Sequence, residues 1–570
     1  MNNYYTNFFH VRIPLWKDIR GWLSDRSNLF FVLLIVVHLL PIWLFKYFPS
    51  QDGAAHVHNA NVLREYYFPD RTAFREYYVL NKDLVPNWSS HLVMAGLMHI
   101  VSPLVAEKIL LSGYVILLPI SIRYALQAIR LDAGFLAFVA FPFIYNYPLH
   151  MGFYNFSYSL PMFFFVVGYW LKYHNRFTLG KVVTLTLLSL LLYFCHLFSL
   201  VTAYVAIALL TIWLTVLDIA QQSHQQRSNL RSLTRSFRLR ALVPLCAFLP
   251  TLILVVMFFL RPSTASAKTI WRPVPLWEQA LKLFSLSSIA SYDRLELLFS
   301  TALAGLFVAV SLYLLRSKVV HRQINGWDGF LLIVATYVVI YFITPDKMSG
   351  GGTIKERLLV YPFFALILWF GTHSYHRLVK QRIQLVAVGI ALILLGLHTI
   401  KYAELNNYLE EYLSGMHLIE QNTTLLPLSF SHFGHTPDGQ RLSWRQIGPF
   451  RHAAGYIAAQ RGIVDLANYE AAKGYFPTIF RPQLNSYKYI SIEQKSGNME
   501  VQPPRVDFLT YPQRTGGRVD YVLLWDVRDE QRDNVYTKSI FRQLQEGYEL
   551  IYTSPQRGFM HLYRRKDWKQ

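Results

Sequence analysis

Charged residues and cysteines are both scarce in this chain of 570 residues. Asp, Glu, Lys and Arg make up 16% of it, against about 25% in ordinary soluble proteins, so the chain is not a string of soluble domains. The two cysteines, Cys195 and Cys246, lie inside apolar runs, which excludes a disulfide framework and a cysteine-based metal site. No P-loop, zinc-protease or dinucleotide-binding motif occurs, so no ATPase or nucleotide-sugar machinery is visible.

Apolar residues are abundant where charged residues are rare. Hydrophobic residues account for 53% of the chain and aromatic residues for 16%, and the mean hydropathy is +0.24. Apolar runs of about 20 residues recur, long enough to cross a bilayer core about 30 Å thick. The sequence therefore predicts a polytopic α-helical membrane protein with about eleven transmembrane helices. The expected spans are 29–48, 104–127, 133–149, 155–173, 180–194, 198–218, 241–260, 293–315, 328–344, 356–371 and 383–400.

Basic residues give the chain a formal net charge of +21 and a pI near 9.7. They cluster in the short connections between apolar runs, most densely in residues 221–240, as expected for cytoplasmic loops. The surplus is therefore a topology signal and not a sign of a nucleic-acid partner. We expect a cytoplasmic N-terminus and an extracytoplasmic C-terminal region, in a bacterial inner membrane.

Two domains are expected. Residues 1–400 form the transmembrane domain, with outside loops at 49–103, 261–291 and 344–357. Residues 401–570 form a small extracytoplasmic α/β domain, because strand-like and helix-like patterns follow one another there. The expected strands are 521–525, 548–553 and 558–565, and the expected helices are 448–462 and 535–547.

The richest polar motif follows the first expected span and reads PSQDGAAHVHNANVLREYY. In a helix beginning after Gly53, Asp52 and His56 are four residues apart and share a face, with His58 close by. A carboxylate and an imidazole so placed could position a hydroxyl or share a divalent metal ion, which the pair permits without requiring it. The alternative is that Asp52 only caps the helix.

The string DGAAHVHNANVL after a long first span resembles the corresponding loop of the GT-C glycosyltransferases, as does the overall plan of many spans followed by an outside α/β domain. The likeness is to protein mannosyltransferases and aminoarabinose transferases. These multispan enzymes take sugars from polyprenyl-phosphate carriers. The resemblance implies a GT-C-like fold, Asp52 as catalytic base, and transfer with inversion to a glycan, lipid or protein acceptor. Where protein mannosyltransferases have an Asp-Glu pair, this chain has Asp52 followed by Gly53.

A second motif, TPDKMSGGGTIKERLLVYPF, precedes the tenth expected span. Its glycines, Gly350, Gly351 and Gly352, allow positive φ angles and exposed amides, which can form an anion-binding nest. Lys355 and Arg357 follow and would suit a phosphate. The alternative is a flexible hairpin whose cations meet lipid headgroups.

Further polar residues lie in outside turns. NYPLHMGFYNFSYSLP contributes His150 and Asn155 among tyrosines, which suit a sugar or an aromatic belt at the membrane interface. His196 lies in the turn between two short spans, where it either lines a cavity or is exposed. Lys268 and Arg272 belong to a loop that could close over substrate.

We therefore expect an integral membrane glycosyltransferase that uses a polyprenyl-phosphate sugar and contacts membrane lipid. Two other classes stay open. One is a transporter or flippase of lipid-linked glycans, and the other is a non-catalytic membrane assembly subunit. Charges inside spans usually mark transport paths, and the expected spans contain few of them.

Overall fold

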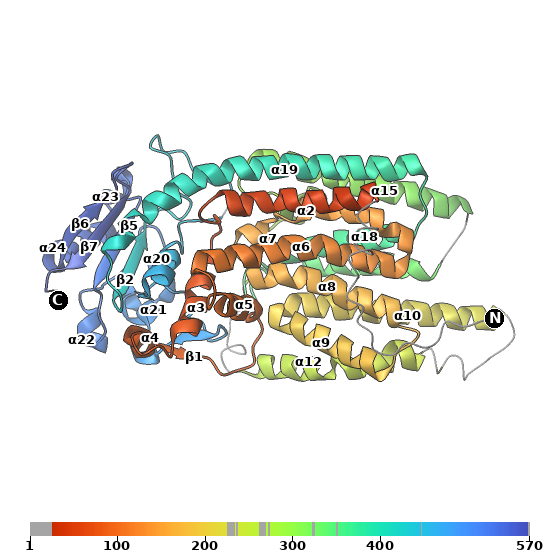
Figure 1. Ribbon diagram of the computed structural model, residues 1–570, viewed down its shortest axis with the longest axis horizontal. Coiled ribbons are helices and arrows are strands. Elements are labelled where there is room, and N and C mark those ends of the chain that lie inside the picture. Colours follow the sequence, from red (N-terminus) through yellow and green to blue (C-terminus); the bar gives the residue numbers. More distant parts are fainter. Residues whose placement is uncertain are drawn as a thin grey trace.

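The computed structural model describes residues 25–224, 234, 237–261, 269–271, 274–321, 325–348, 351–445 and 447–567. Most of the basic stretch 221–240 lies outside these residues, as do Gly350, Lys268 and Arg272. The described chain forms a bundle of long helices at one end and a smaller α/β domain at the other (Figure 1).

Each expected span coincides with a helix of the bundle. Their bounds are α2 (Arg26–Leu44), α6 (Pro103–Ile129), the 3₁₀ segment η1 (Leu131–Phe143), α8 (Tyr154–Tyr173), α9 (Leu179–Cys195), α10 (Leu197–His224), α12 (Val243–Leu260), α15 (Arg294–His321), α16 (Gly329–Ile343), α18 (Val360–Gly371) and α19 (Arg377–Tyr412). Shorter helices lie at the end nearest the α/β domain, namely α7 (Tyr147–His150), α14 (Leu276–Phe284) and α17 (Ile354–Leu358).

The prediction of eleven spanning helices is wrong. In the described residues seven helices are long and apolar enough to cross a membrane. They are α2, α6, α10, α12 with the π-helical turn before it, α15, α16 with the 3₁₀ turn before it (Gly326–Asp328), and α19. η1 and α9 have only 13 and 17 residues, α8 begins with the polar stretch YNFSYS, and the 12 residues of α18 are nearly all buried. A helix packed inside other helices is as apolar as one that faces lipid, so apolar runs alone overcount spans.

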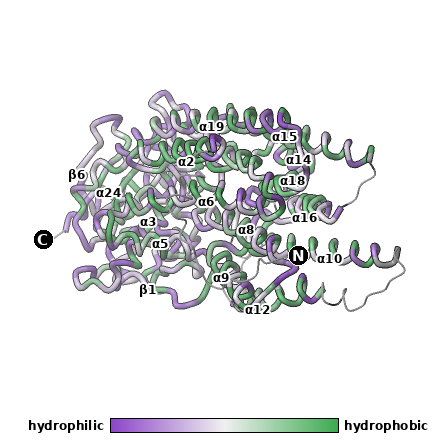
Figure 2. The backbone as a smooth tube through the Cα atoms, turned by 45° about the vertical axis from the view of Figure 1, so that its right-hand side comes forward, coloured by the Kyte–Doolittle hydropathy of each residue, from purple (hydrophilic) through white to green (hydrophobic). Residues whose placement is uncertain are grey.

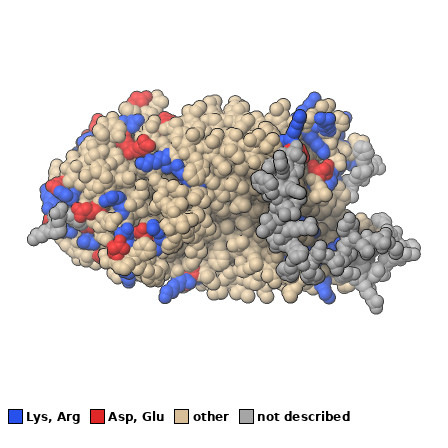
Figure 3. Space-filling model, viewed as in Figure 1, with Lys and Arg blue, Asp and Glu red and all other residues tan. Residues whose placement is uncertain are grey.

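The middle of the bundle carries few charges on the face seen in Figure 3. In Figure 3 Lys, Arg, Asp and Glu gather toward the two ends of the visible face and leave the middle largely uncharged. Figure 2 shows hydrophobic residues dominating the long helices. Large apolar side chains such as Leu33, Leu249 and Leu385 are exposed there. Outward apolar side chains on long helices fit lipid as the solvent, so this is a polytopic helical membrane protein. Its orientation stays a prediction.

The α/β domain is built on a five-stranded mixed sheet. The strand order is β3-β2-β5-β7-β6, with β2 parallel to β3 and β5, and β7 antiparallel to β5 and β6. The strands are β2 (Thr424–Ser429), β3 (Val464–Asp465), β5 (Tyr521–Trp525), β6 (Tyr548–Thr553) and β7 (Met560–Arg565). The helices of the domain are α20 (Ala454–Arg461), α21 (Ser486–Tyr489), α22 (Tyr511–Thr515), α23 (Asp529–Arg532) and α24 (Val535–Gly547).

The segment between α2 and α6 folds onto this domain. It contains α3 (Gly53–Glu65), α4 (Thr72–Tyr77), β1 (Tyr78–Leu80) and α5 (Ser89–Leu97). β1 pairs antiparallel with β4 (Thr478–Phe480), and Val62 and Phe74 share a hydrophobic core with the sheet residues Leu426 and Val522. This segment and the domain therefore form one packed unit, which sets α3 against the membrane helices (Figure 1).

Candidate active site

A cavity of about 980 Å³ lies where the bundle meets this packed unit. Ligand pockets in proteins run to about 1,000 Å³, so this one can hold a large ligand. It gathers most of the residues that the sequence singled out. Those lining it are Asp52, His56, Asn155, His196, Gly351, Gly352, Lys355 and Arg357.

The backbone of Asp52 is held by the turn after α7. Gln51 N–H donates to the His150 carbonyl at 3.0 Å, and Asp52 N–H donates to the Met151 carbonyl at 3.2 Å. Gly152 has a φ of 79°, and a Cβ there would meet the backbone of Asp52. The turn must therefore have glycine at this position, both for its conformation and for the close approach.

The carboxylate of Asp52 does not cap α3. Although Asp52 occupies the N-cap position, its side chain makes no capping hydrogen bond. It accepts one from Gln51 Nε2 at 3.0 Å, and His452 Nε2 lies 3.7 Å away. Burial raises the pKa of Asp52, and burial together with the nearby Arg451 lowers the pKa of His452 well below its usual range. Asp52 is thus a buried carboxylate beside a neutral imidazole.

Gly53 explains why no second acid follows Asp52. A Cβ on Gly53 would run into the Tyr154 hydroxyl and the Ser50 hydroxyl. These two hydroxyls are 3.1 Å apart. Any side chain at position 53 would have to displace this buried pair.

His56 turns toward partners other than Asp52. Its Nδ1 lies 2.5 Å from Glu470 Oε1 and 3.0 Å from His91 Nε2. Among the described residues, the group of metal-binding side chains around His56 consists of His91 and Glu470. Asp52, the other member of the predicted metal pair, does not belong to this group.

Two predicted substrate-binding histidines do not line the cavity. His58 is fully buried beside the Tyr78 hydroxyl, 3.3 Å from its Nε2, and burial lowers its pKa to about 3. His150 is buried against Ser291, whose Oγ lies 2.7 Å from its Nδ1. It contributes to the site through its carbonyl group. Asn155 does line the cavity, but its amide oxygen accepts from Ser90 N–H at 2.8 Å and holds the start of α5.

Arg357 lines the cavity without a carboxylate partner. In the described part of the chain no carboxylate lies within ion-pair distance of it, and its buried Nε has no hydrogen-bond partner. Its Nη1 lies 3.0 Å from His196 Nε2, and its guanidinium group stacks 4.1 Å above the Phe153 ring. Aromatic faces and one imidazole position this cation without neutralising it.

The segment before Arg357 is a tight turn. Met348 and Gly351 exchange backbone hydrogen bonds of 3.0 and 2.9 Å, and Thr353 adopts a φ of 54°, which is unusual for a β-branched residue. Lys355 Nζ donates to Gln279 Oε1 at 2.7 Å. The predicted anion nest includes Gly350, which lies outside the described residues, so that hypothesis stays a prediction.

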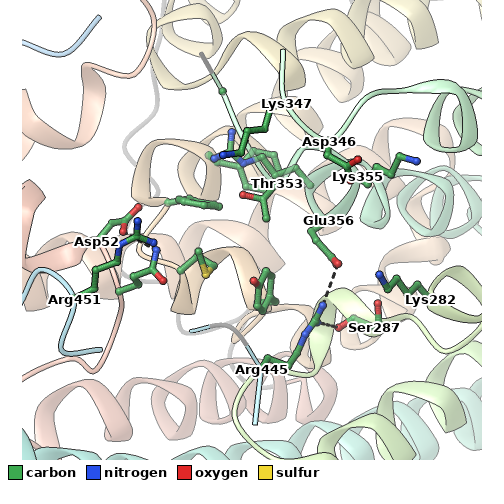
Figure 4. A pocket seen from close by; sticks show the side chains of 18 of the residues that line it. Asp52, Lys282, Ser287, Asp346, Lys347, Thr353, Lys355, Glu356, Arg445 and Arg451 are labelled. Atoms are coloured by element: carbon green, nitrogen blue, oxygen red, sulfur yellow. Dashed lines mark hydrogen bonds and ion pairs between the residues drawn. The ribbon is translucent and has the colours of Figure 1, made fainter. Parts of the chain in front are cut away.

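Two other arginines of the cavity form ion pairs, and the sequence motifs pointed to neither arginine. Arg445 bonds Glu356 at 3.1 Å and Arg451 pairs with Glu500. Figure 4 shows Asp52 beside Arg451 on one side and Lys355 on the other. Three basic residues precede α20, namely Arg445, Arg451 and His452. Their spacing matches no motif for a binding site, so their basic character is the one sequence signal that could have indicated them.

Comparisons with known proteins add no assignment. No protein-family model matches the chain, and no curated protein matches it significantly. The likeness to the GT-C glycosyltransferases therefore rests on the quoted residues alone, and function has to be argued from the cavity.

Proposed function

We propose that this protein is a membrane glycosyltransferase that moves a sugar from a polyprenyl-phosphate carrier to a hydroxyl group on a glycan, lipid or protein acceptor. One observation carries the proposal. A buried carboxylate, Asp52, and a guanidinium group, Arg357, face the same cavity. Among the described residues, no Lys or Arg lies within ion-pair distance of Asp52, and no Asp or Glu lies within that distance of Arg357. A hydroxyl group of the acceptor could give its proton to Asp52, and a phosphate of the donor could pair with Arg357.

Arg357 suits the carrier phosphate. Unpaired charge in a partly buried site is costly unless a ligand compensates it, and a guanidinium group can bind two phosphate oxygens at once. Lys355 adds a second cation on the same segment. The cavity is also lined by residues of the apolar bundle, such as Phe156 and Tyr341, so an isoprenoid tail can stay in lipid while its phosphate reaches Arg357.

Asp52 suits the acceptor. Its carboxylate would take the proton of the acceptor hydroxyl as that oxygen attacks the anomeric carbon. The bond between this carbon and the phosphate oxygen breaks, and the electron pair leaves with polyprenyl phosphate, stabilised by Arg357 and Lys355. Attack opposite to the leaving group inverts the anomeric centre. A raised pKa makes Asp52 a stronger base than an ordinary aspartate.

The direct test uses the full-length protein in nanodiscs with a panel of polyprenyl-phosphate sugars. We expect the release of polyprenyl phosphate together with a glycosylated acceptor, and loss of both in Asp52→Asn. Glu76→Gln is the control, because Glu76 lies on the same segment between α2 and α6 with its side chain 42% exposed. Movement of intact donor without bond cleavage would instead identify a flippase and overturn the proposal.

The proposal also requires the cavity to face away from the cytoplasm. A reporter fused at Gln570 should be active only outside the cytoplasm, and one inserted within 221–240 only inside. The opposite result at either point would contradict the proposal, because it would put the loop of Asp52 and the glycine-rich loop on different sides of the membrane.

A further inference from the structure

Three buried side chains meet beside the cavity and take no part in the chemistry proposed above. His56 comes from α3, His91 from α5, and Glu470 from the chain after β3. Their exposed fractions are 4%, 0% and 0%. His56 Nδ1 and His91 Nε2 are 3.0 Å apart, and each contacts one oxygen of the Glu470 carboxylate, at 2.5 and 2.9 Å.

When Glu470 is ionised, no placement of protons turns all three of these contacts into hydrogen bonds. Each imidazole nitrogen must carry a proton to donate to the carboxylate. Two N–H groups then face each other across 3.0 Å and repel. If one nitrogen gives up its proton, its lone pair faces the carboxylate instead. One contact of the three therefore stays unfavourable in every arrangement, and water has no access to relieve it.

We propose that His56, His91 and Glu470 bind one zinc ion. A cation at the centre makes all three contacts favourable, because each lone pair then points at it. Two imidazole nitrogens and one carboxylate are a ligand set that zinc accepts, leaving a fourth position for water. Magnesium and calcium prefer oxygen ligands throughout.

The geometry needs only a small adjustment. Tetrahedral zinc with bonds of about 2.0–2.1 Å sets its ligand atoms about 3.3 Å apart. Taken to the nearer oxygen of Glu470 for each histidine, the three observed separations run from 2.5 to 3.0 Å, so the side chains would move apart by about 0.3–0.8 Å. Rotation about the side-chain bonds of Glu470 and His91 can supply this.

Such an ion would join segments that are remote in the sequence. His56 and His91 are 35 residues apart, and Glu470 follows His91 by 379. The ion would fix α3 and α5 to the α/β domain. His56 lies one helical turn after Asp52, so the ion would also fix the beginning of α3 and thereby the position of Asp52. The three ligands are therefore positioning residues.

Metal content is the first test. The purified full-length protein is stripped with a chelator, incubated with zinc chloride, freed of excess ion and analysed by mass spectrometry. Wild type should retain about one zinc ion per chain. His91→Asn and Glu470→Gln should weaken zinc binding by more than the roughly 10–100-fold that loss of an outer-shell partner causes. His99→Asn is the matched control, because His99 is exposed just beyond α5.

Thermal unfolding of the wild type is the second test and does not depend on any variant folding. Zinc, but not magnesium, should raise the Tm of the stripped wild-type protein, since a ligand that binds only the folded state stabilises it. Absence of bound zinc in the wild type, an equal effect of magnesium, or full zinc retention by both folded variants would each overturn the site. Glycosyl transfer is not the readout, so failure here leaves the proposed function standing.

Discussion

Two kinds of charged residue meet in the cavity, and they differ in what surrounds them. Arg445 with Glu356 and Arg451 with Glu500 form ion pairs between segments of the fold. Asp52 and Arg357 have no such partner among the described residues. Paired charges contribute to folding by holding segments together, whereas unpaired charges cost stability and are compensated only when a ligand arrives. We therefore expect Asp52 and Arg357 to act on substrate more strongly than the residues of these two ion pairs.

The largest effect is expected at Asp52. Asp52→Asn keeps the size of the side chain and its bond with Gln51 but removes the base, so turnover should fall by about 100-fold or more. The structure adds a second expectation, that stability does not fall, because no capping bond is lost. Transfer assays and thermal unfolding of the same preparation measure both. Normal turnover with a lowered Tm would restore the helix-cap interpretation.

Arg357 should show the next largest effect. Loss of a charge-assisted bond of about 1.5–3 kcal/mol predicts that Arg357→Ala weakens donor use by roughly 10- to 150-fold. Arg357→Lys should recover only part of this, because lysine cannot bind two oxygens in a fork. Lys355→Ala should have a smaller effect, since the ammonium group already bonds Gln279.

The apparent KM for the lipid donor distinguishes these three variants. Equal values in all of them and in wild type would mean that the phosphate binds elsewhere. Arg261, which directly follows α12, would then be a candidate, although it already pairs with Asp83.

Acidification should reduce turnover about tenfold per pH unit once Asp52 is mostly protonated. Because burial raises the pKa of Asp52, this acidic limb should begin above the pH range of an ordinary aspartate, whose pKa is about 3.9. The effect of pH on the free energy of unfolding has the opposite sign. A carboxyl group with a raised pKa in the folded state favours folding when protonated, so its contribution is lost as pH rises through that pKa. A pH–rate profile and a pH series of Tm values measure the two trends.

The smallest effect on turnover is expected from the residues that form ion pairs in the cavity. Glu356→Gln breaks the pair with Arg445, whose guanidinium group still donates to the Ser287 and Ala290 carbonyls. Because both side chains are about 15% exposed, we expect a loss of about 1–3 kcal/mol in the free energy of unfolding. Turnover per folded molecule should change less than in Arg357→Ala. A larger loss of turnover would place Glu356 among the residues that act on substrate.

Local patterns were sufficient for part of the α/β domain. The expected strands 521–525 and 548–553 and the expected helix 535–547 match β5, β6 and α24, and Gly462 ends α20 with a φ of 65°. The central strand β2 was missed because it contains Pro427 and is buried on both faces, so it shows no alternation. The helix expected at 448–462 is shorter in the structure, where α20 begins at Ala454.

The sequence by itself determined the membrane class, the positions of the helical segments and several of the residues that line the cavity, because hydrophobicity and glycine-rich or acidic turns are local properties. Tertiary packing decided how many helices are long and apolar enough to span. It also decided which charges are neutralised. Glu470 meets His56 and His91, and Arg357 meets Phe153 rather than a carboxylate. These contacts join residues that are remote along the chain, and no local pattern encodes which of them will be brought together.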